Sequence, residues 1–367
     1  MKVLMISTDR KIFEPKSEVR QRMIEYAGLF DELKIIVFSK KDSSGGNISL
    51  TTNCVANKTN SLSPFLYVWD AIKISQALIG DGSDWVVTCQ DPFETGLVGW
   101  WLKKKLKVKL QLQVHTDLMS PYFKRESLKN LLRVNIAKFL LPRADKIRVV
   151  SERIKQSLEN LKLKTGPIVL PIFVGQGEET EPQTDLHNKY PQFDFIILMA
   201  SRLSREKNFS LALESFAEAG LDKIAGLVIV GEGPEKQNIK KKIKNLQIDN
   251  KVILEPWVEN LTDYYKSADL FLLTSNYEGY GRTLIEAGLA GCPILTTDIG
   301  LVGDVIDKES ALICSVGDKD CLVDSISVAV SNNSLLRVQS LRLKENLESK
   351  IVTQKADYLR RYKDSMV

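Results

Sequence analysis

The sequence predicts an α/β protein built from two doubly wound domains, each with a parallel sheet between layers of helices. Short apolar runs rich in β-branched residues alternate with amphipathic stretches along the 367 residues. The runs are apolar at consecutive positions, as strands buried on both faces require. A polar segment containing Gly177, Pro182 and Pro191 interrupts the alternation near mid-chain. The length and this interruption together indicate two domains joined by a linker at residues 176–193.

The N-terminal domain is expected at residues 1–175. Its strands are predicted at residues 3–7, 33–38, 85–89, 109–114 and 147–151, and its helices at 18–30, 94–106, 126–140 and 152–161. Since helical stretches separate most of these strands, parallel neighbours are expected. The first six residues are too short and too quickly polar for a secretory signal, which favours a buried first strand.

The C-terminal domain is expected at residues 194–350 and repeats the same alternation. Its strands are predicted at 195–200, 227–230, 252–254, 270–274, 294–297 and 311–314, and its helices at 208–219, 235–246, 260–267 and 282–290. Residues 351–367 are expected to form a C-terminal helix that could cross back to the N-terminal domain. No apolar run reaches the roughly 18–20 residues that span a bilayer.

The cysteine and histidine content limits the kinds of metal site that the chain could form. Five scattered cysteines show no metal-ligand spacing and favour free or buried thiols in a reducing cytoplasm. Two histidines, His115 and His187, exclude a histidine-rich metal centre but not a carboxylate-bound ion. No metal site is therefore predicted from histidine or cysteine.

Two acids, Glu278 and Glu286, stand eight positions apart with glycines beside the first. An apolar run precedes this segment and another follows it, which predicts strand, turn, helix and strand. One carboxylate is then expected on the turn and the other inside the helix, with the helix N-terminus between them. Such a terminus binds phosphate well. Carboxylates on both sides of an anion site suit a ligand with hydroxyls flanking a phosphate, as in a sugar nucleotide.

Two further turns follow strands of the same domain. Arg202 and Lys207 lie five positions apart on a turn that opens a helix. Two fixed cations there could hold a diphosphate and stabilise charge on it as a leaving group, whereas the alternative is a solvated basic loop. Gly231 and Gly233 flank Glu232 ahead of Pro234; this is weak evidence for ligand binding, and a structural turn is the preferred interpretation.

Taken in order, these elements resemble the retaining glycosyltransferases of family 4, which have the GT-B fold of two Rossmann-like domains facing a cleft. The matching segments are 201–208, 230–234, 265–272, the Glu278–Glu286 block and 290–294, with thinner likeness at 91–96, 114–116 and 143–151. The chain departs from the family pattern at residues 9–17, which lack the usual Gly-Gly loop. It departs again at 171–175, where Pro-Ile-Phe-Val-Gly replaces a Pro-Asn-Gly segment.

The resemblance implies a role for each matching residue. Glu278, Arg202, Lys207 and His115 are implied as the catalytic set: Glu278 and His115 contact the transferred sugar, and the two cations hold the diphosphate. Glu286 is implied to accept hydrogen bonds from the ribose. Backbone groups of Gly231, Gly279, Tyr280, Gly281, Thr283 and Leu284 are implied to line the donor site. The resemblance also implies hexosyl transfer from a UDP-sugar or a GDP-sugar, without a metal ion or other cofactor.

A basic segment in the first half suggests a further partner. Residues 95–150 hold thirteen Lys or Arg against three acids, a net charge of +10. Residues expected to face a membrane are Trp100, Trp101, Lys103, Lys104, Lys105, Lys124, Arg125, Lys129 and Arg133. Tryptophan and lysine among apolar residues favour reversible binding to an anionic membrane surface. The alternative is that the apolar residues pack on the sheet and the lysines are solvated; a nucleic-acid partner is not expected.

The sequence thus predicts a retaining glycosyltransferase on the cytoplasmic face of the cell membrane. Its acceptor would be a hydroxyl of a glycolipid or lipid-linked saccharide in surface polysaccharide synthesis. The alternative is a non-catalytic subunit that binds a sugar nucleotide or scaffolds a synthesis complex. The base, the sugar and the acceptor linkage are not specified by the motifs.

Overall fold

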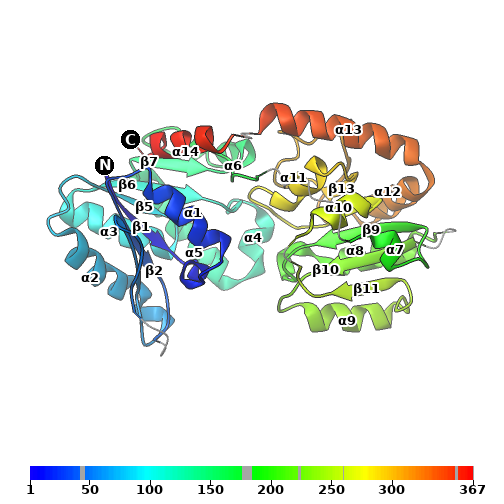
Figure 1. Cartoon of the computed structure of the whole chain (residues 1–367), viewed down its shortest axis with the longest axis horizontal. Helices are drawn as coiled ribbons and strands as arrows, with labels where there is room; N and C mark the ends of the chain where they lie inside the picture. Colours follow the sequence, from blue (N-terminus) through cyan, green and yellow to red (C-terminus); the bar gives the residue numbers. More distant parts are fainter. Residues whose placement is uncertain (42–45, 176–183, 222–224, 259, 352–353, 367) are drawn as a thin grey trace. The chain divides into compact units, whose positions relative to one another are not determined.

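The computed structural model describes residues 1–41, 46–175, 184–221, 225–258, 260–351 and 354–366 (Figure 1). The chain divides into two compact units, one formed by Met1–Pro171 with Gln354–Val367 and the other by Ile172–Thr353. Each unit contains one sheet with helices packed against it. The predicted α/β class with two parallel-sheet domains is confirmed.

The N-terminal unit has an eight-stranded sheet in the order β3-β4-β2-β1-β5-β6-β7-β8. The strands are β1 (Lys2–Ser7), β2 (Glu32–Val37), β3 (Ile48–Thr51), β4 (Cys54–Lys58), β5 (Trp85–Cys89), β6 (Lys109–Val114), β7 (Lys146–Val149) and β8 (Ile168–Val169). All neighbours pair in parallel except β3, which runs antiparallel to β4. Because β1 lies between β2 and β5, the strand order reverses there, and ligands of such sheets bind beyond the strand ends at a reversal of this kind.

Helices of this unit follow the strands. They are α1 (Glu18–Ala27), α2 (Tyr67–Ile79), α3 (Glu94–Leu106), α4 (Pro121–Glu126), α5 (Leu128–Leu140) and α6 (Glu152–Ser157), with short 3-10 turns at Arg10–Phe13, Pro64–Leu66 and Leu141–Arg143. Helix α3 packs against both α2 and α5. A helix that follows a parallel strand runs back along the sheet, so α2, α3 and α5 all begin at the carboxyl edge of the strands.

Helix α14 (Lys355–Asp364) packs on this N-terminal unit, far along the chain from the strands that it covers. Tyr362 is buried, and its ring stacks on Tyr26 with centroids 4.1 Å apart. Arg148 on β7 donates to the Tyr358 hydroxyl at 3.0 Å. Residues 352–353, inside the expected C-terminal segment, lie outside the described residues.

The second unit has a six-stranded parallel sheet in the order β11-β10-β9-β12-β13-β14. Its strands are β9 (Phe195–Ala200), β10 (Ala225–Val230), β11 (Val252–Glu255), β12 (Leu270–Leu273), β13 (Ile294–Thr297) and β14 (Leu312–Cys314). Its helices are α7 (Leu186–Lys189), α8 (Phe209–Glu218), α9 (Lys236–Asn245), α10 (Thr262–Ser267), α11 (Arg282–Leu289), α12 (Lys319–Ser331) and α13 (Asn333–Lys350), with a 3-10 turn at Arg205–Lys207. Strands β9, β10 and β12 are buried along their full length, which explains their unbroken apolar sequence.

Part of the expected linker belongs to the second unit. Helix α7 lies within it, and Leu186 and Phe193 are buried. A Cβ atom placed on Gly226 would meet the Phe193 ring at 2.2 Å, so this glycine admits the ring against β10. The first unit ends at Pro171, earlier than the expected 175. Residues 176–183 of the expected linker lie outside the described residues.

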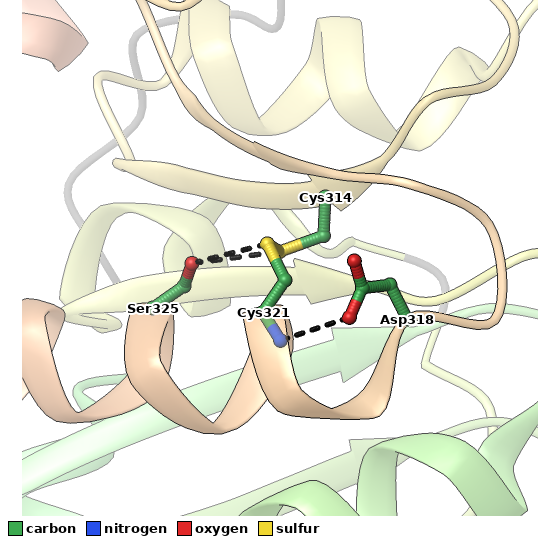
Figure 2. The surroundings of a disulfide bond; sticks show 4 residues. All are labelled: Cys314, Asp318, Cys321 and Ser325. Atoms are coloured by element: carbon green, nitrogen blue, oxygen red, sulfur yellow. Dashed lines mark hydrogen bonds between the residues drawn. A yellow bond between two sulfur atoms is a disulfide. The ribbon is translucent and has the colours of Figure 1, made fainter.

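The expectation of free thiols is wrong for two cysteines. Cys314 at the end of β14 and Cys321 in the first turn of α12 form a disulfide (Figure 2). Asp318 caps α12 by accepting from the Cys321 amide at 3.0 Å, which holds the helix start beside the strand end. The sequence separation of seven gave no indication of this pairing. Cys54, Cys89 and Cys292 are buried free thiols, as expected.

Candidate active site

The predicted donor residues of the second unit lie on turns at the carboxyl edge of its sheet. Residues 201–208 follow β9, residues 231–234 follow β10, and residues 274–281 follow β12. Parallel strands present their carboxyl ends at one edge. The strand order places β9 between β10 and β12, so the three turns are neighbours.

Two of the predicted catalytic residues contact each other. Lys207 forms an ion pair with Glu278, and both side chains are about 15% exposed. Glu278 also accepts a hydrogen bond from the Ser275 hydroxyl at 2.8 Å. The carboxylate is therefore held by a cation and a hydroxyl at the edge of the sheet, with its charge balanced.

Backbone and amide contacts fix the two turns that carry this pair. The Asn276 amide donates to the Glu206 carbonyl at 2.7 Å, and the Asn208 side-chain amide donates to Asn276 Oδ1 at 3.0 Å. The Thr274 hydroxyl donates to the Lys207 carbonyl at 3.0 Å. These contacts position Lys207 through its own backbone. Asn276 was missed by sequence reasoning, although it lies inside the acidic motif.

Arg202 has a different environment from Lys207. Its side chain is 72% exposed, and it donates to Glu206 at 2.8 Å. Burial alone would raise the pKa of Glu206, but hydrogen bonds from Ser204 and Arg202 hold that pKa below its ordinary value. An ionised Glu206 orients a guanidinium that remains open to solvent and to an incoming anion.

Glu286 lies in α11, as predicted, with the helix start between it and Glu278. Gly281 is the N-cap residue, with φ of 84° and no capping side chain. Glu286 accepts from Arg282 Nε at 2.6 Å and from the Tyr265 hydroxyl at 3.2 Å. Burial, together with the Glu286 charge, holds the pKa of Tyr265 well above its usual range, so this hydroxyl stays a donor.

The remaining predicted donor residues surround this helix start. Gly279, Tyr280 and Gly281 are buried in the turn, and Thr283 is half-buried. The Leu284 side chain is fully buried, so only its backbone can face a ligand. A Cβ atom on Gly300 would lie 2.7 Å from the Tyr280 carbonyl. The turn after β13 can therefore pack against Tyr280 only because residue 300 is glycine. Gly300, with φ of 57°, was also missed by the motif comparison.

Gly231 and Gly233 have a packing role in this structure. A Cβ atom on Gly231 would lie 2.1 Å from the Ser201 carbonyl oxygen, and one on Gly233 would lie 2.3 Å from that of Leu203. These glycines let the turn after β10 approach the turn that carries Arg202. The interpretation as a structural turn fits this geometry.

In the N-terminal unit, His115 lines a cavity of about 380 Å³ at the carboxyl ends of β1, β5 and β6. Asp9, Arg22 and Asp91 also line it. Burial raises the pKa of Asp91 to about 6. This carboxyl group accepts from the Phe93 amide at 2.8 Å, so it shapes the start of α3 as well as the cavity.

The proton on His115 has a defined place. Its Nε2 lies 3.0 Å from Gln113 Oε1, which also accepts from Arg148 at 3.1 Å. A carbonyl oxygen only accepts, so Nε2 carries the proton and Nδ1 is an acceptor. Loss of hydration and the nearby Arg148 and Arg22 charges lower the pKa of His115 to about 3. The ring is neutral at physiological pH.

The predicted membrane-facing residues divide into two groups. Lys103 pairs with Asp145, and Arg133 pairs with Glu94 at 3.0 Å, a carboxylate that the more exposed Lys129 approaches at 4.0 Å. Trp100 is half-buried against Phe139, with ring centroids 5.2 Å apart, and Trp101 is half-buried. The exposed cations are Lys104 and Lys105 at the end of α3, Arg125 at the end of α4 and Lys129 at the start of α5, with Lys124 half-buried next to Arg125.

The start of α5 also exposes apolar side chains. Leu128 is 87% exposed, and Leu131 and Leu132 are exposed on the same helix. Lys104 and Lys105 lie at the opposite end of the helix layer, because α3 runs away from the carboxyl edge. A helix of this length is about 20 Å long. The basic residues therefore form two clusters rather than one face.

Neither a spanning helix nor a metal cluster is found in the described part of the chain. No helix there is long and apolar enough to cross a membrane. No group of three or more His, Cys, Asp or Glu side chains in the same ranges could hold a metal ion.

Residues 182–346 match the family described as Glycosyl transferases group 1. Among curated proteins, the chain is 28% identical to the alpha-monoglucosyldiacylglycerol synthase of Streptococcus pneumoniae over 57% of this chain and 51% of that protein. It is 24% identical to the N-acetyl-alpha-D-glucosaminyl L-malate synthase of Bacillus anthracis over 68% and 65%. The matches thus span about half to two thirds of the length of these relatives.

Solved structures of similar fold cover nearly the whole chain. A sucrose-phosphate synthase from Thermosynechococcus elongatus has a TM-score of 0.81 at 17% identity, over 99% of this chain and 98% of that one. The Anabaena protein Alr3699/HepE, in complex with UDP, has a TM-score of 0.75 at 16% identity, over 100% and 99%. The two units with their parallel sheets therefore have the GT-B fold. The family match over residues 182–346, together with these relatives, supports a glycosyltransferase family 4-like protein.

Proposed function

We propose that this protein is a retaining glycosyltransferase that moves a sugar from a nucleotide diphosphate sugar to a hydroxyl of a glycolipid or lipid-linked saccharide. The observation that carries the proposal is the contact between Lys207 and Glu278 beside the start of α11. It brings together a cation, a carboxylate and a helix N-terminus at the carboxyl edge of a parallel sheet. These residues lie within the segment 182–346 that matches the group 1 glycosyl transferases.

The chemistry follows from the charges. In the proposed complex, Lys207 and Arg202 contact the diphosphate and stabilise the negative charge that grows as the sugar leaves. Glu278 then accepts from hydroxyls of the transferred sugar while staying paired with Lys207. The start of α11 offers backbone N–H groups to the phosphates. Two fixed cations supply the electrostatic stabilisation that a metal ion provides elsewhere, so no metal or cofactor is part of this proposal.

The donor is proposed to be a UDP-sugar or a GDP-sugar. The crystal structure of the Anabaena protein of similar fold is a complex with UDP, which supports a nucleoside diphosphate as part of the donor. Glu286 is proposed to accept from the ribose hydroxyls. It already accepts from Arg282 and Tyr265, so its charge and orientation suit that contact.

The acceptor is proposed to be membrane-bound. The name of the Streptococcus relative describes a glucosylated diacylglycerol product, and that of a Campylobacter jejuni relative describes an undecaprenyl-diphosphate-linked acceptor. Exposed leucines and cations at the start of α5 support docking of the N-terminal unit on an anionic bilayer. We place the protein at the cytoplasmic face of the cell membrane, and neutral His115 in the acceptor-side cavity supports a contact with sugar hydroxyls.

A thermal-shift panel of nucleotides and sugar nucleotides, followed by transfer assays with the best donor, tests this function. Stabilisation by one nucleoside diphosphate, together with product of retained anomeric configuration, is the expected result. Donor binding without transfer to any lipid-linked or saccharide acceptor would favour the alternative, a non-catalytic subunit. Absence of stabilisation by every nucleotide would contradict both.

A further inference from the structure

A patch of four large apolar side chains surrounds the start of α2, outside the basic segment discussed above. Phe65 is 91% exposed, Leu62 78%, Trp69 62% and Leu66 38%. Phe65 and Leu66 in the Pro64–Leu66 turn lie four and three residues before Trp69 in the first turn of α2, so these three share one side of the helical segment, and Leu62 lies just before it. Apolar side chains that cluster in solvent mark an interaction surface.

The chain segment that carries this patch is held in place. The Tyr67 ring, one residue beyond Leu66, stacks on Phe38 with centroids 5.4 Å apart. Arg10 donates to the Tyr67 hydroxyl and to the Phe38 carbonyl, both at 3.0 Å. The exposed side chains therefore project from a fixed base.

Basic residues surround the patch. Arg10 is exposed beside Tyr67. Lys40 and Lys41 are exposed, and both pair through their backbones with Ser61, the residue before Leu62. Lys73, one turn after Trp69, is exposed as well. Asp70 is the one acid between residues 58 and 80.

The position of the patch relates it to the proposed acceptor side. Helices α2 and α5 both begin at the carboxyl edge of the N-terminal sheet, with α3 packed between them. Two interaxial spacings separate the two helix starts, about 20 Å. The cavity that contains His115 and Asp91 lies at the same edge of the same sheet.

We propose that Leu62, Phe65, Leu66 and Trp69 insert into the surface of an anionic lipid bilayer, and that they act as a second contact beside the start of α5. This inference rests on the proposed function and deepens it. Phenylalanine and tryptophan with a basic rim are the composition of interfacial segments, and each cation adds attraction to anionic headgroups. Two separated contacts restrain the tilt of the unit, which holds the His115 cavity next to the membrane surface.

A protein partner is the competing occupant. Interface cores between proteins are depleted of lysine, whereas the exposed neighbours of these apolar side chains along the chain and across the Ser61 pairing are lysines and an arginine. The charges instead complement a surface of phosphate headgroups. The same edge of the sheet also carries the exposed leucines at the start of α5. A planar partner such as a bilayer surface can therefore contact both the patch at α2 and these leucines.

The test is co-sedimentation of the whole chain with phosphatidylcholine vesicles, with and without phosphatidylglycerol. Phe65→Ser with Trp69→Ser should lower the partition coefficient on anionic vesicles about ten-fold. Val338→Ser with Leu341→Ser removes exposed apolar side chains from α13 in the other unit and serves as the matched control, with no change expected. Trp69→Phe should keep binding but reduce quenching of tryptophan fluorescence by brominated lipid.

Several results would overturn the inference. The Phe65/Trp69 variant could partition like the wild type while Arg125→Glu with Lys129→Glu abolishes binding. That pair of results would make the start of α5 the membrane contact and exclude the patch at α2. The wild type could instead fail to bind vesicles but self-associate with rising concentration, and the Phe65/Trp69 substitutions could abolish that association. This result would assign the patch to contact with a second copy of the same chain. Nucleotide stabilisation measured on each variant separates these outcomes from failure of the proposed function, since it must stay at the wild-type level.

Discussion

Lys207 and Glu278 form an ion pair although they are 71 positions apart in the chain. Both lie on turns of the second unit, at the ends of neighbouring strands β9 and β12. The pair places a positive charge beside the carboxylate that we propose contacts the transferred sugar. Its geometry leads to a specific expectation for each partner.

Lys207→Ala should lower turnover about 100-fold or more, since it removes a cation from the leaving diphosphate. The substitution also leaves Glu278 without its ion-pair partner. Arg202→Ala should lower turnover to a similar degree, although Arg202 is exposed. Initial rates of sugar transfer at saturating donor measure both effects, with Arg205→Ala, an exposed neighbour, as the control. Near-normal rates for both variants would refute the leaving-group role.

Glu286→Ala should weaken nucleotide binding and leave the fold intact, because the carboxylate is near the surface of α11. Arg282→Ala keeps the carboxylate but removes its cation, so it should change nucleotide affinity much less. Calorimetric titration with the preferred nucleoside diphosphate measures both. Equal losses in the two variants would indicate that the ion pair, and not a ribose contact, matters for binding.

His115 should show no titration between pH 5 and 8. Its pKa is lowered to about 3, so the folded protein keeps the ring neutral while the unfolded chain protonates near pH 6.5. Stability linked to this group is therefore present above pH 6.5 and is lost as pH falls toward 3.

Nuclear magnetic resonance can follow this directly, since the chain has two histidines. The His115 ring resonances should stay constant from pH 8 to 5. His187→Gln assigns the signals. A midpoint near 6.5 for His115 would contradict the described environment.

Replacing Cys314 and Cys321 by Ser should lower the free energy of unfolding of the second unit by about 2–3 kcal/mol under oxidising conditions, because the closed loop is short. Wild type with a reductant should approach the variant. Cys292→Ser tests a buried free thiol as the control. Mass spectrometry after alkylation shows whether the bond forms, and unchanged denaturant midpoints would show that it does not stabilise this unit.

The two basic clusters should differ in membrane binding. Arg125→Glu with Lys129→Glu, next to exposed leucines, should reduce co-sedimentation with anionic vesicles strongly. Lys104→Glu with Lys105→Glu changes the same number of charges at the other end of the helix layer and should have a smaller effect. The reverse order would place the end of α3 on the membrane instead.

Much of the fold could be predicted from the sequence. Strands β5, β6, β9 and β13 and helix α3 have the predicted bounds. Burial on both faces leaves an unbroken apolar run in β9, whereas β6 carries the buried polar residues Gln111 and Gln113. The hairpin of β3 with β4 was missed, since an edge strand with exposed residues lacks that signal. Helix α2 was missed as well, because its exposed Trp69 and neighbouring apolar residues obscure an amphipathic pattern.

The candidate site was less predictable than the fold. Motif order indicated the residues Lys207 and Glu278 but not their contact, which depends on the pairing of β9 with β12. Counting charge over residues 95–150 omitted Glu94, so the pairing of Arg133 with that acid was not expected. The packing of Gly300 against Tyr280 involves two turns distant in sequence, and no local pattern predicts it.

Helix α14 has a consequence for how the chain acquires its structure. The ribosome makes the whole second unit before it makes the residues that cover β6 and β7. Until then Arg148 and the Tyr26 ring lack the Tyr358 and Tyr362 contacts that complete their surroundings. The unit translated first is therefore expected to finish folding after the unit translated second, and a chaperone that shields its open face would act during that interval.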